Sequence, residues 1–296
     1  HMKMAIHFLA DGFKHRIPIK NLSAIDIIIL LIITYKISVY TLLLNYKKIF
    51  ICTSMFIIVL AVNHRTFDKD FTLTMVDVGQ GEAFVLQDHR HLKTVVIDTG
   101  GMYSPDDQGI KLSDKTLLPY LKEQGIDTID LIIISHLDID HSGELLHVVS
   151  KKETGNIMMN KSDVKFEEWR EALPADIEKK IIDSREISQF KLGDMYFHNI
   201  SMSDVSGDSN EQSIVLKTVL SDFSILFTGD IGVDTENMLF KAADVNSDIL
   251  KVGHHGSDTS TSEAFVKAVS PAISLISAGE NNRYGHPHQS VLDTLS

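Results

Sequence analysis

The sequence predicts an α/β domain of two sheets with outer helices, preceded by a membrane helical hairpin. The first observation behind this prediction is the charge distribution. Residues 1–70 hold nine Lys and Arg against four Asp and Glu, whereas the rest of the chain holds 19 against 36. The second is the hydropathy pattern: two long apolar runs lie in the basic part, and short apolar runs separated by turn residues fill the acidic part. These differences indicate that the basic part lies in a membrane and the acidic part lies in water.

The two long apolar runs predict a pair of transmembrane helices. The run from Ile25 to Leu44 contains 20 residues and only two charges, Asp26 and Lys36, and about 20 residues cross a bilayer as a helix. The run from Ile49 to Val62 contains 14 residues, which is short for a span unless the bilayer thins locally or the flanking side chains snorkel. The alternative is a core helix and a buried strand of a soluble protein, but neither run has the polar face of a soluble helix.

From Phe71 onward the pattern changes to short strands and helices. Strands are expected at FTLTMVDVGQG, AFVLQ, KTVVIDTGG and DLIIIS, with a helix at TLLPYLKEQG that stops at Gly125. A second set of strands is expected at SIVLKTVL, SILFTGD and AISLIS, with a helix at EAFVKAVS. A mixture of this kind is typical of a layered α/β domain.

The stretch SHLDIDHSGE, residues 135–144, follows a buried strand and is rich in metal-ligand side chains. In an extended chain His136 and Asp138 point the same way, and Asp140 and His141 lie on the following turn, so the four can diverge toward two adjacent metal ions. Imidazole and carboxylate together suit zinc, manganese or iron. A single cysteine cannot build a thiolate site. The alternative is a solvated, acidic helix cap.

Three further stretches support the metal interpretation. FTGD places Asp230 at a strand end, VGHHGS places His254 and His255 on a glycine-flanked turn, and RYGHPH places His286 and His288 in a loop. Loops at the ends of rigid strands are where proteins carry polar chemistry. Each stretch alone would be an ordinary turn, but together they indicate one site.

The order of these motifs resembles the metallo-β-lactamase superfamily, and within it the branch at the C-terminus of the ComEC competence proteins, which carry DNA across bacterial membranes. The motifs are DVGQG, DTGG, HLDIDH, FTGD, KVGHHGSDTSTS and NNRYGHPH. The resemblance implies an αββα sandwich with a two-metal hydrolytic site at one edge. The expected segments are an N-terminal flank at residues 1–24, two transmembrane helices at 25–63 and a metallo-β-lactamase-like hydrolase domain at 71–296.

The resemblance also implies a role for each candidate ligand. His136 and Asp138 would hold the first metal, Asp230 would bridge both metals, and Asp98 of DTGG would orient the site from a neighbouring strand end. The implied ligands of the second metal are Asp140, His141 and His255, with His254 as the alternative to His255.

Two departures from the superfamily pattern refine the expectation. Asp138 stands where the superfamily usually has a histidine, a substitution also seen in this branch and in related phosphodiesterases, and it moves the expected substrate from β-lactams to phosphate esters. The superfamily also supplies a further histidine to the first metal, and the corresponding window here holds only His147 and His198. His147 is expected to pack on an apolar helix, and His198 is a strand residue. Oxygen ligands and water would then complete the first site, which favours manganese or magnesium over zinc.

The expected function is a metal-dependent nuclease or phosphodiesterase of a DNA-uptake machinery that degrades the strand that is not imported. Two divalent ions, manganese or zinc with magnesium as a further option, would lower the pKa of a bridging water and stabilise the transition state. Asp138 or Asp140 would orient that water. His286 would give a proton to the leaving group or contact a phosphate, and its alternative role is that of a structural turn histidine.

The resemblance implies single-stranded DNA as substrate, and the membrane and other competence channel proteins as partners. The catalytic domain would lie on the extracellular face of the cell membrane. One alternative is a phosphodiesterase for a small or lipid-linked phosphate ester, and another is an inactive metal-binding scaffold of a transport channel. The net charge of −17 beyond residue 70 argues against a nucleic-acid substrate, because DNA-binding domains usually carry a basic footprint.

Overall fold

The computed structural model describes residues 24–66, 71–88, 92–101, 111–171, 173–202, 205 and 207–296. The expected N-terminal flank lies outside the described residues except for Ala24. The chain divides into two compact units, His1–Asp70 and Phe71–Ser296, and each is described by itself.

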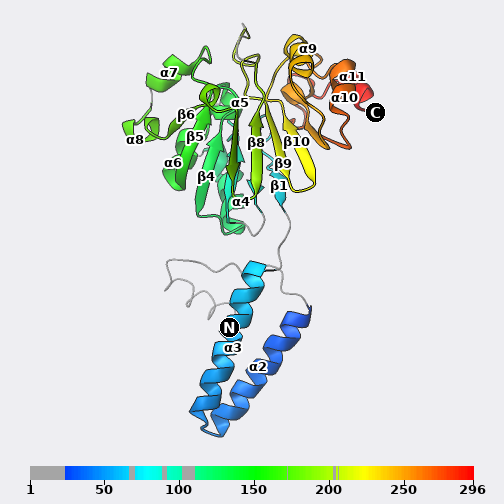
Figure 1. The fold of residues 1–296 in the computed structure, drawn as a ribbon. Helices are drawn as coiled ribbons and strands as arrows, with labels where there is room; N and C mark the ends of the chain where they lie inside the picture. Colours follow the sequence, from blue (N-terminus) through cyan, green and yellow to red (C-terminus); the bar gives the residue numbers. More distant parts are fainter. Residues whose placement is uncertain are drawn as a thin grey trace. The chain divides into compact units, whose positions relative to one another are not determined.

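The first unit contains two helices in the region of the expected hairpin, α2 (Ala24–Leu42) and α3 (Tyr46–Thr66), which lie against each other (Figure 1). Leu44 adopts a left-handed conformation in the turn between them. The Asn45 side chain accepts a hydrogen bond from the Lys48 backbone N–H at 3.2 Å and so caps α3.

Many apolar side chains of this helix pair are exposed, among them Leu31 at 64%, Leu42 at 85% and Phe50 at 73%. Within the described part of the chain, none of the helices combines the length and the apolar character that crossing a membrane requires. The two predicted helices are therefore present, whereas their transmembrane character stays a prediction.

The second unit contains two six-stranded sheets. In the first sheet, the first three strands pair antiparallel and the last four pair parallel. Its strands, in spatial order, are β1 (Thr72–Met75), β2 (Phe84–Gln87), β3 (Thr94–Ile97), β4 (Thr128–Ile133), β5 (Glu153–Met159) and β6 (Ile181–Asp183).

In the second sheet, three strands pair parallel and the others pair antiparallel. Its strands, in spatial order, are β12 (Ile273–Leu275), β11 (Ile249–Lys251), β10 (Phe223–Phe227), β9 (Leu216–Leu220), β8 (Met195–Asn199) and β7 (Gln189–Leu192).

Helices cover the outer faces of both sheets (Figure 1). The first sheet is covered by α4 (Leu117–Glu123), α6 (Leu145–Lys151), α7 (Phe166–Glu171) and α8 (Ala175–Glu178). The second is covered by α9 (Val233–Ala242), α10 (Glu263–Val269) and α11 (Gln289–Leu295).

Strand β4 shows how one strand serves two layers. Leu131 and Ile133 face the space between the sheets, where the rings of Phe84 and Phe227 meet edge to face at 5.4 Å. Ile132 points the other way, toward the outer helices, because side chains alternate along a strand. The resulting αββα sandwich confirms the two-sheet fold predicted from the sequence.

Candidate metal centre

The candidate site lies where strands of both sheets end. Asp98 follows β3, His136 lies just beyond β4, Asp230 lies beyond β10, and His255 lies beyond β11. The backbone joins the two sheets here, because Ile214 N–H donates to the Ser135 carbonyl at 2.8 Å. Local strand ends therefore bring distant parts of the sequence to one edge of the sandwich.

The loop after β4 is held by the glycine-containing motifs. Asp138 is the N-cap residue of the single-turn helix α5 (Ile139–Ser142). The Asp140 carbonyl accepts a hydrogen bond from Glu82 N–H at 3.0 Å, and the His141 carbonyl accepts one from Thr99 N–H at 2.8 Å. A Cβ on Gly101 would lie 1.9 Å from the Ile139 carbonyl oxygen, so this approach requires glycine.

Four side chains converge here, and all of them except Asp140 are buried. His141 Nε2 lies 3.2 Å from His255 Nε2, and both nitrogens lie 3.3 Å from Asp230 Oδ2. Asp140 Oδ2 lies 3.2 Å from His255 Nε2. Among the described residues, two groups have ligand atoms within 4.8 Å of one another: the first is His136, His141 and Asp230, and the second is Glu82, His141 and His255.

Contacts to the Nδ1 atoms of His141 and His255 fix the direction in which their Nε2 atoms point. The Asp98 carboxylate lies 2.7 Å from His141 Nδ1 and also accepts from the N–H and hydroxyl of Ser135. His255 Nδ1 lies 2.8 Å from the Ser277 carbonyl oxygen. Contacts of this kind orient metal-binding histidines in other proteins, and the orienting role of Asp98 stays a prediction.

The electrostatics separate the two histidines of the HLDIDH motif. Burial alone would lower the pKa of His141, but the carboxylates of Asp230 and Asp98 raise it well above its usual value. Burial, reinforced by the charge of His141, lowers the pKa of His136 well below its usual value. Burial opposes ionisation of Asp230, yet His141 and Lys251 hold its pKa well below the usual range.

These residues fit a divalent metal ion. The Nε2 atom of His136 is buried and has no hydrogen-bond partner among the described residues, and its low pKa keeps the imidazole neutral. A neutral imidazole beside an ionised carboxylate is the donor set of zinc and manganese sites. The Nε2 atoms of His141 and His255 and the Asp230 carboxylate lie within hydrogen-bond distance of one another. A bound cation would take the place of the protons between them.

A buried lysine and its partner were not predicted from the sequence. The Lys251 Nζ atom contacts the Glu82 carboxylate, lies 3.2 Å from Asp230 Oδ1 and donates to the Gly229 carbonyl at 2.8 Å. Burial would lower the pKa of Lys251, but Glu82 and Asp230 raise it. Asp230 thus gives one oxygen to Lys251 and the other to the histidines. The available signal was a charged residue next to an apolar run, Glu82 before AFVLQ and Lys251 after DIL, because buried charges are almost always paired.

Asp138 belongs to neither group of converging ligand atoms. Its carboxylate Oδ1 lies 2.5 Å from Lys165 Nζ, and both side chains are partly exposed. The structure therefore places this predicted ligand at the edge of the cluster, in an ion pair.

The other histidines considered from the sequence also lie outside the two groups. The His254 ring lies 3.3 Å from the Thr259 hydroxyl. His286 stacks 6.4 Å from the His255 ring, and burial together with the charge of His254 lowers its pKa. His147 lies on α6 and pairs with Asp114 at 2.9 Å, and His198 lies on β8.

Comparison with known proteins supports the resemblance. The profile of the metallo-β-lactamase superfamily matches residues 76–280. The chain is 32% identical over 257 residues to ComE operon protein 3 of Bacillus subtilis, covering 82% of this chain and 32% of that protein. It is 28% identical over 221 residues to Recombination protein 2 of Haemophilus influenzae (74% and 26% covered) and 28% identical over 228 residues to Competence protein ComA of Neisseria gonorrhoeae (76% and 29% covered).

The chain belongs to the metallo-β-lactamase superfamily. Its relatives ComE operon protein 3 and Competence protein ComA place this metallo-β-lactamase domain with the ComEC-type competence proteins, and the chain spans about a third of their length. Superfamily membership makes it a metal-dependent hydrolase.

Asp98→Asn is expected to weaken binding of the metal that His141 holds by about 10- to 100-fold, because the ring loses its charged outer partner. A competition titration with a fluorescent chelator measures this affinity. Asp244→Asn removes the same charge from an exposed pair with Lys217 and serves as the control. Equal affinity in Asp98→Asn and Asp244→Asn would remove Asp98 from the site.

Proposed function

We propose that this chain is a two-metal phosphodiesterase that cleaves single-stranded DNA, as part of a DNA-uptake machinery that degrades the strand not imported. The observation that carries the proposal is the buried convergence of His136, His141, Asp230 and His255 at the strand ends of a metallo-β-lactamase fold. An aspartate at position 138 and the competence-protein relatives support phosphate esters and DNA uptake.

In this proposal the ligands keep the roles that the superfamily pattern implies. His136 and Asp138 would bind the first ion, Asp140, His141 and His255 would bind the second, and Asp230 would serve both. Two bound divalent ions supply Lewis-acid polarisation of a phosphate and activation of water. Manganese is expected to support more activity than zinc or magnesium, because the first ion has few nitrogen ligands.

The remaining side chains handle the substrate and the proton. Burial opposes ionisation of Asp140, but His255 and His141 lower its pKa and keep the carboxylate charged, so that it can accept a hydrogen bond from the attacking water. His286 stays neutral because its pKa is lowered, so its ring binds the leaving group or a phosphate oxygen as a neutral hydrogen-bond partner.

A small phosphodiester is the second candidate substrate, because the net charge of −17 beyond residue 70 repels a polyanion. Because salt screens this repulsion, a moderate rise in ionic strength is expected to leave DNA binding unchanged or to strengthen it.

The test is to strip the protein of metal and add back manganese, zinc or magnesium in the presence of single-stranded DNA, double-stranded DNA or a chromogenic phosphodiester. Metal-dependent cleavage of single-stranded DNA is the expected result. Hydrolysis of the small diester alone would replace the nuclease by the small-substrate enzyme. A metal-loaded protein that hydrolyses neither would be a scaffold.

We also propose that the α2–α3 helix pair attaches the chain to the cell membrane, with the catalytic domain on the extracellular face. The exposed apolar side chains of the pair support this proposal. The full chain is expected to sediment with membranes or to need detergent, whereas a chain that starts at Phe71 stays in solution. Equal solubility of the two without detergent would contradict membrane attachment.

A further inference from the structure

The ion pair between Lys165 and Asp138 lies at the rim of the metal centre. Its Nζ–Oδ1 distance is 2.5 Å, and the two side chains are 48% and 30% exposed. Lys165 directly precedes α7, and Asp138 lies 27 residues earlier in the HLDIDH motif. The Lys165 ammonium thus contacts a predicted metal ligand, Asp138, and is partly exposed to solvent.

Lys165 is built into the site by a buried carboxylate. Asp163 is 4% exposed and accepts a hydrogen bond from Lys165 N–H at 2.8 Å through Oδ1. Its Oδ2 atom accepts from Leu137 N–H at 3.1 Å and from the Ser209 hydroxyl at 2.6 Å. Leu137 lies between His136 and Asp138, so one carboxylate fixes both the metal loop and the backbone of Lys165.

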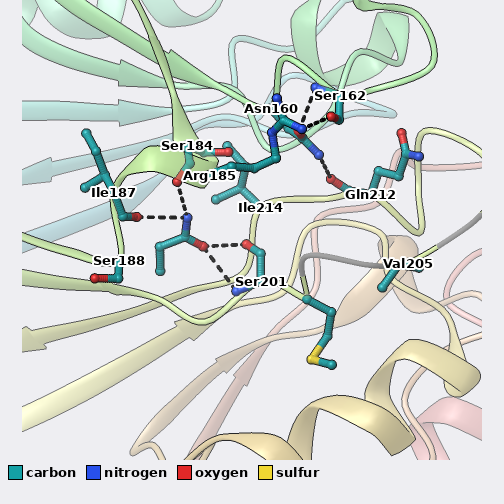
Figure 2. A pocket seen from close by; sticks show the side chains of 12 residues that line it. Asn160, Ser162, Ser184, Arg185, Ile187, Ser188, Ser201, Val205, Gln212 and Ile214 are labelled. Atoms are coloured by element: carbon teal, nitrogen blue, oxygen red, sulfur yellow. Dashed lines mark hydrogen bonds between the residues drawn. The ribbon is translucent and has the colours of Figure 1, made fainter.

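The rest of this loop is anchored to a polar pocket at its side. Figure 2 shows the Asn160 amide donating to the Gln212 carbonyl, at 3.0 Å, and Arg185 donating to the Ser162 hydroxyl. The Gln212 side chain accepts from Val164 N–H at 3.0 Å. The loop is therefore held from both ends, whereas the Lys165 side chain is partly exposed to solvent.

Two other cations near this site are already engaged. Lys251 is fully buried between Glu82 and Asp230, and Arg185 pairs with Asp183 at 2.7 Å. The Lys165–Asp138 pair is exposed, and exposed ion pairs add little to stability. Replacing the Asp138 carboxylate by another anion beside Lys165 therefore costs little free energy.

We propose that Lys165 is the phosphate-binding residue of this site: when Asp138 turns to the first metal ion, the Lys165 ammonium is released to bind a phosphate oxygen of the substrate. This inference rests on the proposed function, because it requires a phosphate ester at the metal centre. The released Lys165 ammonium also supplies the local positive charge that an acidic domain needs to hold a phosphate.

Inorganic phosphate is the probe for the test, added to the manganese-loaded full chain in an isothermal titration. Lys165→Ala is expected to weaken phosphate binding about tenfold, because a charge-assisted hydrogen bond is lost. Lys165→Arg keeps most of the affinity. Lys179→Ala removes an exposed lysine at the end of α8 and is expected to bind phosphate as the wild type does.

Manganese affinity without phosphate separates this role from a structural one. Lys165→Ala is expected to bind manganese as tightly as the wild type or more tightly, because Asp138 loses a competing partner. A lysine that only supported the loop would give weaker manganese binding when removed.

Steady-state kinetics with the chromogenic phosphodiester complete the test. The loss in Lys165→Ala is expected mainly in KM, whereas kcat changes less. Unchanged phosphate affinity in Lys165→Ala would overturn the inference even where the wild type is active. A different outcome is that Lys165→Ala binds phosphate more weakly while the wild type hydrolyses no phosphodiester. This result would overturn the proposed function and leave the phosphate site in place.

Discussion

His136→Ala is expected to lower kcat/KM for manganese-dependent phosphodiester hydrolysis by at least about a hundredfold. The substitution removes the buried, neutral imidazole whose Nε2 atom has no partner among the described residues, and a two-metal site contributes several kcal/mol to the transition state. The measurement is steady-state hydrolysis of a chromogenic phosphodiester at saturating manganese.

The matched control for this prediction is His147→Ala. His147, on α6, is also a histidine close to the HLDIDH motif, but its ring pairs with Asp114. Its removal is therefore expected to keep activity within about twofold. A similar loss in both variants would indicate a general effect on folding. Full activity of His136→Ala would exclude this histidine from the site.

Asp230→Ala is expected to abolish binding of both metal ions, whereas His255→Ala mainly empties one. Asp230 Oδ2 lies 3.3 Å from both His141 Nε2 and His255 Nε2, so it is the oxygen that both ions would share. Metal content after dialysis, measured by mass spectrometry, gives the number of ions per chain.

The Asp230→Ala variant also leaves Lys251 with Glu82 as its remaining carboxylate contact. Circular dichroism must therefore show that this variant is folded before its metal content is read. Full occupancy in a folded Asp230→Ala protein would show that the ions do not share this residue.

The sequence predicted the parts of the site that follow recognisable strands. His136, Asp230 and His255 each come after a short apolar run, and such runs are identifiable from their pattern. Parallel strands place these ends on one edge of a sheet, so the convergence of distant motifs could be expected. The same reasoning gave two sheets with outer helices.

The parts that depend on tertiary pairing could not be predicted. Glu82 lies in the loop before β2 of the first sheet and Lys251 ends β11 of the second, and nothing in the local pattern of either predicts the contact between them. The alternation rule put Asp138 on the same side as His136, but it could not show that Lys165 pairs with its carboxylate. Asp163 was missed for the same reason, because its importance lies in a hydrogen bond to Leu137.

Anomalous diffraction from crystals grown with manganese tests most directly whether the loops after β4, β10 and β11 form a two-metal site. The expected map has two peaks about 3.5–4 Å apart, both beside Asp230, one of them beside His136 and the other beside His255. A single peak, or peaks away from these side chains in a folded protein, would contradict the two-metal site.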